Sequence, residues 1–265
     1  MKVYMFLKNL FYRTAWTMVP PKPYSRFHIL LTAFGALSAV LFAAYFSGQT
    51  VHKEAAGAKE TFSGHILFSC GLLLAAMEIC KQGFLFFIEN DGRFNWWYFP
   101  FQLCSVPMYL CLGWPLLRSD ALKKTFAGFI QDFGLLGGIM ALAVPPGLMH
   151  PYWIMTLHGF IWHFILIFLG LYCAMSRLTD FGPKGFLRIL PLFFVCCLIA
   201  IAINVLAGPG ADADMFYLSP YHPSSQPVFH RISVILGILP GMLLYILSMV
   251  LGGFLVHSVL KSILS

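Results

Sequence analysis

The amino-acid sequence predicts an all-α protein, a polytopic bundle of about seven transmembrane helices preceded by an interfacial amphipathic helix. Three observations lead to this fold class. The composition is 59% hydrophobic and only 10% charged, whereas an ordinary soluble domain is roughly 25% charged. The mean hydropathy is +0.80. Apolar runs of about 20 residues, the length that crosses a bilayer, recur along the chain. A soluble core of this size could not hide so much apolar surface, so the solvent is lipid.

The first 26 residues form a basic segment. Five of the seventeen basic residues lie there, interspersed with aromatic side chains and leucines. This pattern predicts an amphipathic helix that rests on anionic lipid headgroups. Charges interrupt the apolar run and no small-residue cleavage site follows, which disfavours a signal peptide. The net charge of +7 therefore indicates contact with a membrane surface, and no nucleic-acid partner is expected.

Residues 27–260 are predicted to form one seven-helix membrane domain. The predicted spans are residues 27–47, 61–81, 97–117, 125–144, 152–175, 186–206 and 232–257. A bundle is the economical architecture in lipid, because a helix satisfies its own backbone hydrogen bonds. No internal repeat is evident, which disfavours a transporter built of duplicated halves. Seven crossings would put the two termini on opposite sides, but basic residues lie on both sides and leave the orientation open.

The start of the third predicted span is the most informative stretch. Trp97 and its aromatic neighbours suit a membrane–water interface, and Cys104 follows about one helical turn below them. The start of a helix offers free N–H groups and a positive dipole end, which stabilise a thiolate and an oxyanion. Gln102 and Ser105 add polar groups on either side. The other reading of Cys104 is a buried structural thiol, as for the remaining six cysteines. No Cys-x-x-Cys pair occurs, so neither a disulfide framework nor a zinc site is expected.

Two histidines in the fifth predicted span are candidates for a general base. His158 and His163 are five residues apart, about 140° around a helix, so a regular helix does not direct both into one pocket. His163 lies near the middle of its span, where burial of a polar group costs most, and it is the preferred base. His158 is the reserve. Each could instead bond a carbonyl of a neighbouring helix, and a haem held by His65 and His163 is a weaker alternative.

Other polar groups carry weaker signals. Glu78 could orient a histidine as in a catalytic triad, or simply pair with Lys81 three residues later. The long segment from residue 204 to residue 225 could cap the site or bind a lipid headgroup, with Asn204 and Tyr217 as contacts. A solvated loop is equally compatible with its composition. Asp212 and Asp214 in this segment do not by themselves make a metal coordination set, and no metal or other cofactor is expected.

The segment from Phe99 to Ser105 resembles the Pro-x-x-Leu-Cys signature of YwaF-like bacterial integral membrane proteins. These proteins are related to the eukaryotic transmembrane protein 164 acyltransferases. The resemblance extends from His163 to Tyr172 and to an Asn-terminated sixth helix that leads into a Tyr-Leu-x-Pro loop. It covers most of the chain, from the second predicted helix to the last loop.

The resemblance implies a cysteine-dependent acyltransferase of the bacterial inner membrane that moves fatty acyl chains onto lysophospholipids. Cys104 matches the family cysteine and His163 best matches the family histidine. Gln102 departs from the pattern, because many bacterial relatives place a histidine there. The expected partners are therefore membrane lipids, namely an acyl donor and a lysophospholipid.

The residues assemble into one predicted site. Cys104 is the nucleophile, with His163 or His158 as the base. The oxyanion and orienting groups are Gln102, Ser105 and Glu78, and the substrate-binding groups are Asn204, Tyr217 and Trp97. Two other functions use the same residues. A small-solute or ion transporter would use Glu78, His163 and Asn204 as a polar path, and a lipid hydrolase would let water replace the acceptor.

Overall fold

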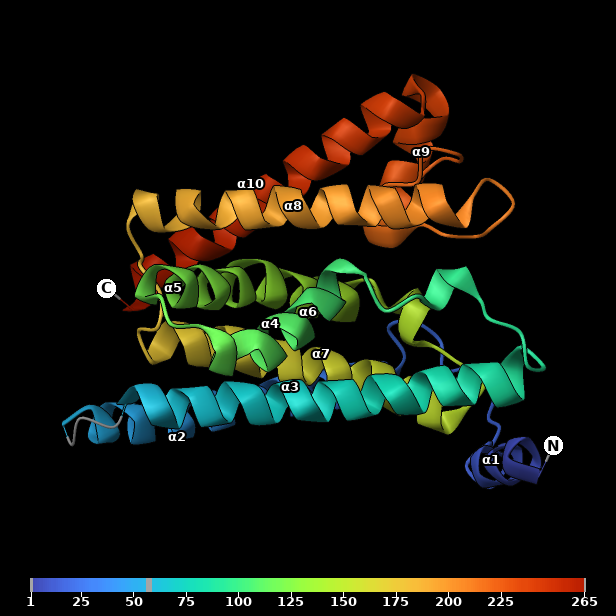
Figure 1. Cartoon of the computed structure of the whole chain (residues 1–265), viewed down its shortest axis with the longest axis horizontal. Helices are drawn as coiled ribbons and strands as arrows, with labels where there is room; N and C mark the ends of the chain where they lie inside the picture. Colours follow the sequence, from blue (N-terminus) through green and yellow to red (C-terminus); the bar gives the residue numbers. More distant parts are fainter. Residues whose placement is uncertain (1, 56–58, 265) are drawn as a thin grey trace.

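The protein is an all-helical bundle, as the sequence predicts (Figure 1). The structure, a computed structural model, describes residues 2–55 and 59–264. Within these residues, six stretches are long and apolar enough to cross a membrane, so this is a multi-pass membrane protein. The six are Arg26–Lys53, Glu60–Glu89, Asp120–Ala143, Trp153–Met175, Pro183–Ala207 and Ile238–Leu264.

The long helices agree with the predicted spans to within several residues, apart from the third and the seventh. The α-helices are α1 (Lys2–Tyr12), α2 (Arg26–Ala55), α3 (Lys59–Phe84), α4 (Val106–Gly113), α5 (Asp120–Phe129), α6 (Leu135–Ala143), α7 (Trp153–Met175), α8 (Pro183–Ala207), α9 (Pro227–Leu236) and α10 (Ile238–Leu264). The N-terminus and the C-terminus lie at opposite ends of the bundle (Figure 1).

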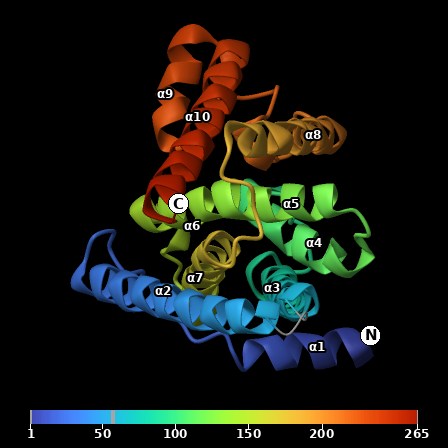
Figure 2. The same cartoon turned by 90° about the vertical axis from the view of Figure 1, so that its left-hand side faces the viewer.

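The N-terminal helix α1 lies across one end of the bundle rather than along it. It is seen end-on in Figure 1 and lengthwise in Figure 2. Its apolar side packs on the end of the second long helix, where the Phe11 ring stacks on Phe87 at 5.7 Å and Tyr4 meets Phe87 edge-on at 5.3 Å. A helix that crosses the bundle axis with an aromatic inner face and basic residues elsewhere fits the membrane–water interface.

The third predicted span is not one continuous helix, so that prediction is wrong in its local structure. A short 3₁₀ turn, Trp96–Tyr98, is followed by extended chain, a second turn at Leu103–Ser105, helix α4 and a final turn at Trp114–Leu116. Prolines explain the breaks. Pro100 lies in the extended chain, Pro107 in the first turn of α4 and Pro115 in the final turn. Each lacks an N–H, so no regular helical hydrogen bond continues through these three positions. The apolar helical part is only Leu103–Leu116, yet the chain still passes from one end of the bundle to the other (Figure 1).

The seventh predicted span begins too early. The chain from Pro227 to Leu236 is a separate helix, α9, which ends at Gly237 with φ +99°. This backbone conformation is open to glycine and strained for other residues, so the helix breaks there. The membrane-spanning helix α10 starts at Ile238 and continues past the predicted end to Leu264.

A π-helical turn, Ile130–Gly134, joins α5 to α6. Its extra residue widens the helix and leaves Gln131 and Asp132 fully buried inside the bundle. Such turns interrupt the regular hydrogen-bond ladder and occur frequently at functional sites.

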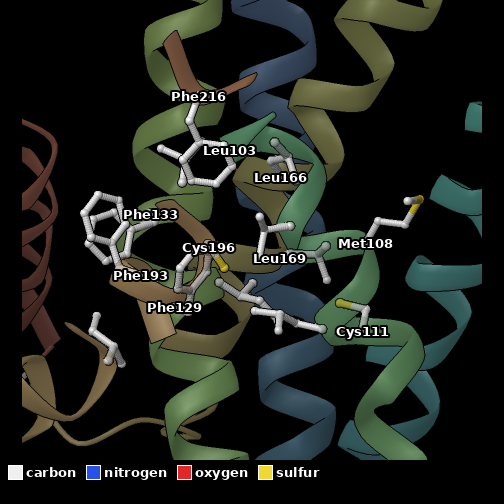
Figure 3. Close-up of a cluster of buried hydrophobic side chains, with 14 of the residues drawn as sticks. Leu103, Met108, Cys111, Phe129, Phe133, Leu166, Leu169, Phe193, Cys196 and Phe216 are labelled. Carbon is white, nitrogen blue, oxygen red and sulfur yellow. The ribbon is translucent and has the colours of Figure 1, made fainter. Parts of the chain in front are cut away.

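The main apolar core lies between α4, the π-helical turn, α7 and α8 (Figure 3). The Phe133 and Phe193 rings stack face to face at 4.4 Å. Leu103 and Phe216 lie at one end of this cluster (Figure 3), which connects the core to the neighbourhood of Cys104. The core thus fixes the start of α4 against α7.

Candidate active site around Cys104

Cys104 lies in the 3₁₀ turn Leu103–Ser105 that leads directly into α4. It is partly buried, and its backbone carbonyl accepts a hydrogen bond of 3.1 Å from the Trp162 indole Nε1 of α7. Helix α6 passes beside it at a glycine, because a Cβ placed on Gly137 would lie 3.9 Å from the Cys104 Cβ. The thiol is therefore held between α6 and α7 at the start of a short helix.

Two backbone N–H groups at Cys104 and its preceding residue are without an acceptor in the described part of the chain. Within the described part of the chain, the N–H groups of Leu103 and Cys104 donate no hydrogen bond, while Ser105 N bonds the Gln102 carbonyl at 2.8 Å. The Ser105 hydroxyl lies beside the thiol. Free N–H groups at a helix start can stabilise a negative oxygen, so the predicted helix-start environment is present despite the broken span.

His163 has a defined tautomer. Its Nδ1 lies 2.6 Å from the Gly159 carbonyl oxygen, one turn earlier in α7. A carbonyl can only accept, so Nδ1 carries the proton and Nε2 keeps its lone pair. His163 is buried, and a buried imidazole with an unprotonated Nε2 is suited to accept a proton.

His158 packs against the face of the Trp162 indole. Its ring stacks on the indole with centroids 5.5 Å apart and planes 29° apart. Its Nε2 is buried and has no hydrogen-bond partner within the described residues. His65 is exposed on α3, so the structure does not support a haem between it and His163.

A charged cluster on α3 faces this region. Lys81 Nζ lies 2.8 Å from Glu78 Oε1, which also accepts a 2.7 Å hydrogen bond from Gln82 Nε2. Gln82 donates a second bond of 2.6 Å to the Tyr98 carbonyl. The cluster is thus joined through Gln82 to the segment that leads into Cys104.

Sequence reasoning paired Glu78 with Lys81, and the structure confirms that ion pair. It missed that Gln82 joins this pair to Tyr98, in the segment that leads into Cys104. The signal was present in the sequence: three polar residues at helical spacing, 78, 81 and 82, lie on one face of an apolar span. Charges retained within such a span are expected to face the bundle interior.

Gln102, predicted as an oxyanion group, and Asn204, predicted as a substrate contact, both bind the loop between α8 and α9. Gln102 Nε2 donates to the Asp214 carbonyl at 3.1 Å, and Gln102 Oε1 accepts from Phe216 N at 2.8 Å. Asn204 Nδ2 donates to the Met215 carbonyl at 3.1 Å, and its Oδ1 accepts from Met215 N at 2.7 Å. Both amides thus bind the loop backbone, although one Gln102 N–H is left over.

The loop between α8 and α9, residues 208–226, is called the lid below; it packs on the bundle and is not a solvated loop. Asp214 is fully buried and accepts three hydrogen bonds, from Ser219 N at 2.9 Å, Ser225 N at 2.9 Å and Ser225 Oγ at 2.6 Å. Asp212 is exposed. Within the described part of the chain, no group of three or more His, Cys, Asp or Glu side chains is placed to hold a metal ion.

The underside of the lid is aromatic and covers the entrance to Cys104. Phe216 stacks on Phe101 at 5.6 Å, and Tyr217 meets Tyr245 edge-on at 5.7 Å. Burial, and then the proximity of Cys104 and Asp214, raise the pKa of Tyr217 to about 12. Its phenol is therefore a neutral donor at ordinary pH.

Trp97 lies in the 3₁₀ turn at the outer edge of the same entrance. Its backbone N–H is held by Asn95 Oδ1 at 2.9 Å, and its side chain is partly exposed. The Trp97 side chain is therefore open to contact from outside the bundle.

Comparison with known proteins gives one result. No curated protein and no solved structure matches the chain. The sequence profile of the TMEM164 family matches residues 23–261, which is nearly the whole chain and includes every residue of the site described above. The protein therefore belongs to the TMEM164 family.

Proposed function

We propose that this protein is an intramembrane acyltransferase that moves a fatty acyl group onto a lysophospholipid through Cys104. The observation that carries the proposal is that Trp162 links the thiol residue to both imidazoles. Its indole Nε1 bonds the Cys104 carbonyl and the His158 ring stacks on its face. His163 is the next residue of α7. A thiol becomes a strong nucleophile when a base takes its proton and a nearby cation stabilises the thiolate. Membership of the TMEM164 family supports the same reaction class.

The first half-reaction loads the cysteine. His163 Nε2 takes the thiol proton, and the Cys104 sulfur attacks the carbonyl carbon of the acyl donor. The negative oxygen that forms is held by the free N–H groups of Leu103 and Cys104 and by the remaining N–H of Gln102. The bond from the carbonyl carbon to the leaving oxygen then breaks, His163 protonates the departing alcohol, and a thioester remains on Cys104.

The second half-reaction transfers the acyl group from Cys104 to the acceptor lipid. The hydroxyl of a lysophospholipid gives its proton to His163 and attacks the thioester carbonyl. The carbon–sulfur bond breaks, the new ester leaves, and His163 returns the proton to Cys104. The net change is transfer of one acyl group from one oxygen to another, without any redox step.

The other site residues have supporting roles. Ser105 and the Lys81 ammonium stabilise the thiolate, and Glu78 holds Lys81 in place through their 2.8 Å ion pair. His158 is the alternative base, because its Nε2 is buried without a partner. Tyr217 and Trp97 contact lipid at the entrance, and Asn204 acts on substrate binding by holding the lid.

Two features favour transfer to a lipid over the alternatives. The lid and its aromatic underside exclude water from Cys104, whereas a hydrolase must admit it. A transport path through Glu78, His163 and Asn204 is less well supported, because both ends of the Asn204 amide bind Met215. The resemblance to YwaF-like proteins leads us to place this reaction in a bacterial inner membrane.

The test uses the purified full chain in detergent with an alkyne-tagged acyl phospholipid and a lysophospholipid acceptor. We expect a hydroxylamine-sensitive acyl label on Cys104 and a tagged phospholipid product. Cys104→Ser should abolish both, and His163→Ala should slow labelling by about 10²–10⁴-fold, the usual contribution of a general base. Cys111→Ser, a buried thiol one to two turns further along α4, is the matched control and should label normally.

Three results would separate the alternatives. Normal transfer by Cys104→Ser would refute the cysteine mechanism. Release of tagged free fatty acid in place of phospholipid would identify a hydrolase. Loss of labelling in His158→Ala but not in His163→Ala would move the base role to His158.

A further inference from the structure

A pocket distinct from the Cys104 region lies at the opposite end of the bundle, the end that faces the viewer in Figure 2. Its volume is about 460 Å³. It forms where the connection between α7 and α8 passes beside α5 and the end of α10. Three cationic side chains from three different helices line it, namely Lys124 of α5, Arg177 at the end of α7 and Lys261 of α10.

The pocket carries an excess of positive charge. Its lining holds three cations and one carboxylate, Asp180. That carboxylate already has a partner outside the lining, since Arg188 Nη2 lies 3.7 Å from its Oδ2. Among the described residues, neither Lys124 nor Lys261 has a carboxylate within ion-pair distance. Like charges held together without counter-charges indicate a site for an anion.

The wall of the pocket is fixed by a buried chain of hydrogen bonds. Thr179 Oγ1 donates to Gln131 Oε1 at 2.6 Å, and Gln131 Nε2 donates to Asp132 Oδ1 at 2.8 Å. Asp132 Oδ2 lies 2.8 Å from His257 Nδ1. His257 is one turn before Lys261 in α10, so the chain connects the two sides of the pocket through the π-helical turn.

The pocket floor adds an apolar surface. Phe181 lines it, and its ring lies 6.1 Å from that of His257. On the same face of α10 as Lys261, two turns further into the bundle, Phe254 is 50% exposed. Its ring lies 5.3 Å from that of Phe186, which lies 5.6 Å from that of His257. In a membrane protein such side chains contact acyl chains. A cationic pocket with an apolar flank at the end of a membrane bundle matches a phospholipid, with its phosphate inside and its chains along α10.

We propose that this pocket binds the phosphate of an anionic phospholipid drawn from the surrounding bilayer. Lys124, Arg177 and Lys261 bind the phosphate oxygens, and the acyl chains lie along α10 at Phe254. The bound headgroup joins α10 to α5 and α7. This site is separate from the Cys104 region and does not depend on acyl transfer.

The test measures thermal unfolding of the full chain in detergent micelles doped with phosphatidylglycerol, with phosphatidylcholine or with inorganic phosphate. A ligand that binds only the folded state raises the melting temperature in a dose-dependent way. We expect phosphatidylglycerol alone to do so. Lys124→Gln and Lys261→Gln should each raise the lipid fraction for half-maximal stabilisation about five-fold, the change that corresponds to about 1 kcal/mol per basic residue.

The matched control is Lys184→Gln. Lys184 is exposed at the same end of the bundle, at the start of α8, but does not line the pocket. All three lysines are exposed, so these variants should fold. The proposal fails if Lys184→Gln weakens the effect as much as Lys261→Gln, which would indicate general surface attraction. It also fails if inorganic phosphate alone reproduces the shift, or if phosphatidylcholine does so equally.

Discussion

A single side chain, that of Trp162, joins the two halves of the candidate site. Its indole N–H bonds the Cys104 carbonyl, and its face carries the His158 ring. The next residue along α7 is His163, whose Nδ1 is bound within the same helix. Trp162 is thus a positioning residue: it sets where the start of α4 lies relative to both histidines and takes no part in the bond changes.

Replacing Trp162 with Phe should separate this positioning from packing. The change keeps an aromatic ring but leaves the Cys104 carbonyl without its partner, a loss of about 1 kcal/mol. We expect the rate of Cys104 acylation to fall about ten-fold while the melting temperature changes little. The measurement is the rate of hydroxylamine-sensitive labelling at saturating donor. Trp153→Phe, on the exposed face of the same helix, is the control, and equal rates for the two variants would remove the positioning role.

For single residues, the sequence predicts which side chains are chemically unusual better than it predicts their hydrogen-bond partners. Cys104 and His163 stand out because a thiol at a helix start and a histidine within an apolar span are unusual in themselves. The use of Gln102 could not be predicted, because its partners Asp214 and Phe216 are over a hundred positions away. Nothing local in the sequence shows whether an amide will bind a substrate or a distant backbone.

At the scale of elements, the lid depends on one buried carboxylate. Asp214→Ala would leave three donors of Ser219 and Ser225 without an acceptor. Each buried unsatisfied donor costs about 1–3 kcal/mol, so the lid should open. We expect much faster hydrogen exchange and protease cleavage within residues 208–226, with the remaining helices unchanged. Asp212→Ala, two residues away and exposed, should behave as wild type; equal protection in the two variants would show that Asp214 does not hold the lid.

The contact of α3 with α4 gives a second prediction. A Cβ on Gly71 would lie 2.8 Å from the Leu112 backbone nitrogen, whereas a Cβ on Gly48 in α2 would have no heavy atom within 4 Å. Gly71→Ala must therefore push α4 away and should cost about 1–3 kcal/mol of stability. Gly48→Ala should be neutral or stabilise by up to about 1 kcal/mol. Thermal unfolding of both variants in one detergent tests this, and a Gly71→Ala protein as stable as wild type would contradict the close approach.

Element boundaries were predictable where apolar runs are uninterrupted. The helix Trp153–Met175 follows its apolar run almost residue by residue. The prediction of one continuous third helix failed because hydropathy averages over Pro100, Pro107 and Pro115. Their missing N–H groups interrupt the helical hydrogen bonds however apolar the neighbouring residues are. The predicted start of the last span was too early because the chain breaks at Gly237, where φ is +99°. Hydropathy does not detect such a backbone effect.

The whole molecule crosses the membrane an odd number of times if the short α4 segment is counted with the six long stretches. This agrees with the termini at opposite ends of the bundle (Figure 1). We expect a membrane-impermeant maleimide to label Asp91→Cys from the side of the N-terminus and Asp120→Cys from the other side, because these two exposed positions flank residues 103–116. The background chain has its seven native cysteines replaced. Labelling of both positions from one side would show that residues 103–116 do not complete a crossing.

The position of Cys104, one turn inside an aromatic entrance and beneath a lid, has a consequence for how its rate should be measured. Donor and acceptor lipids can reach such a site by lateral diffusion without leaving the bilayer. The rate of acyl transfer should then follow the mole fraction of each lipid within the membrane. Diluting the substrate with inert phospholipid should slow turnover, whereas diluting whole vesicles in buffer should not.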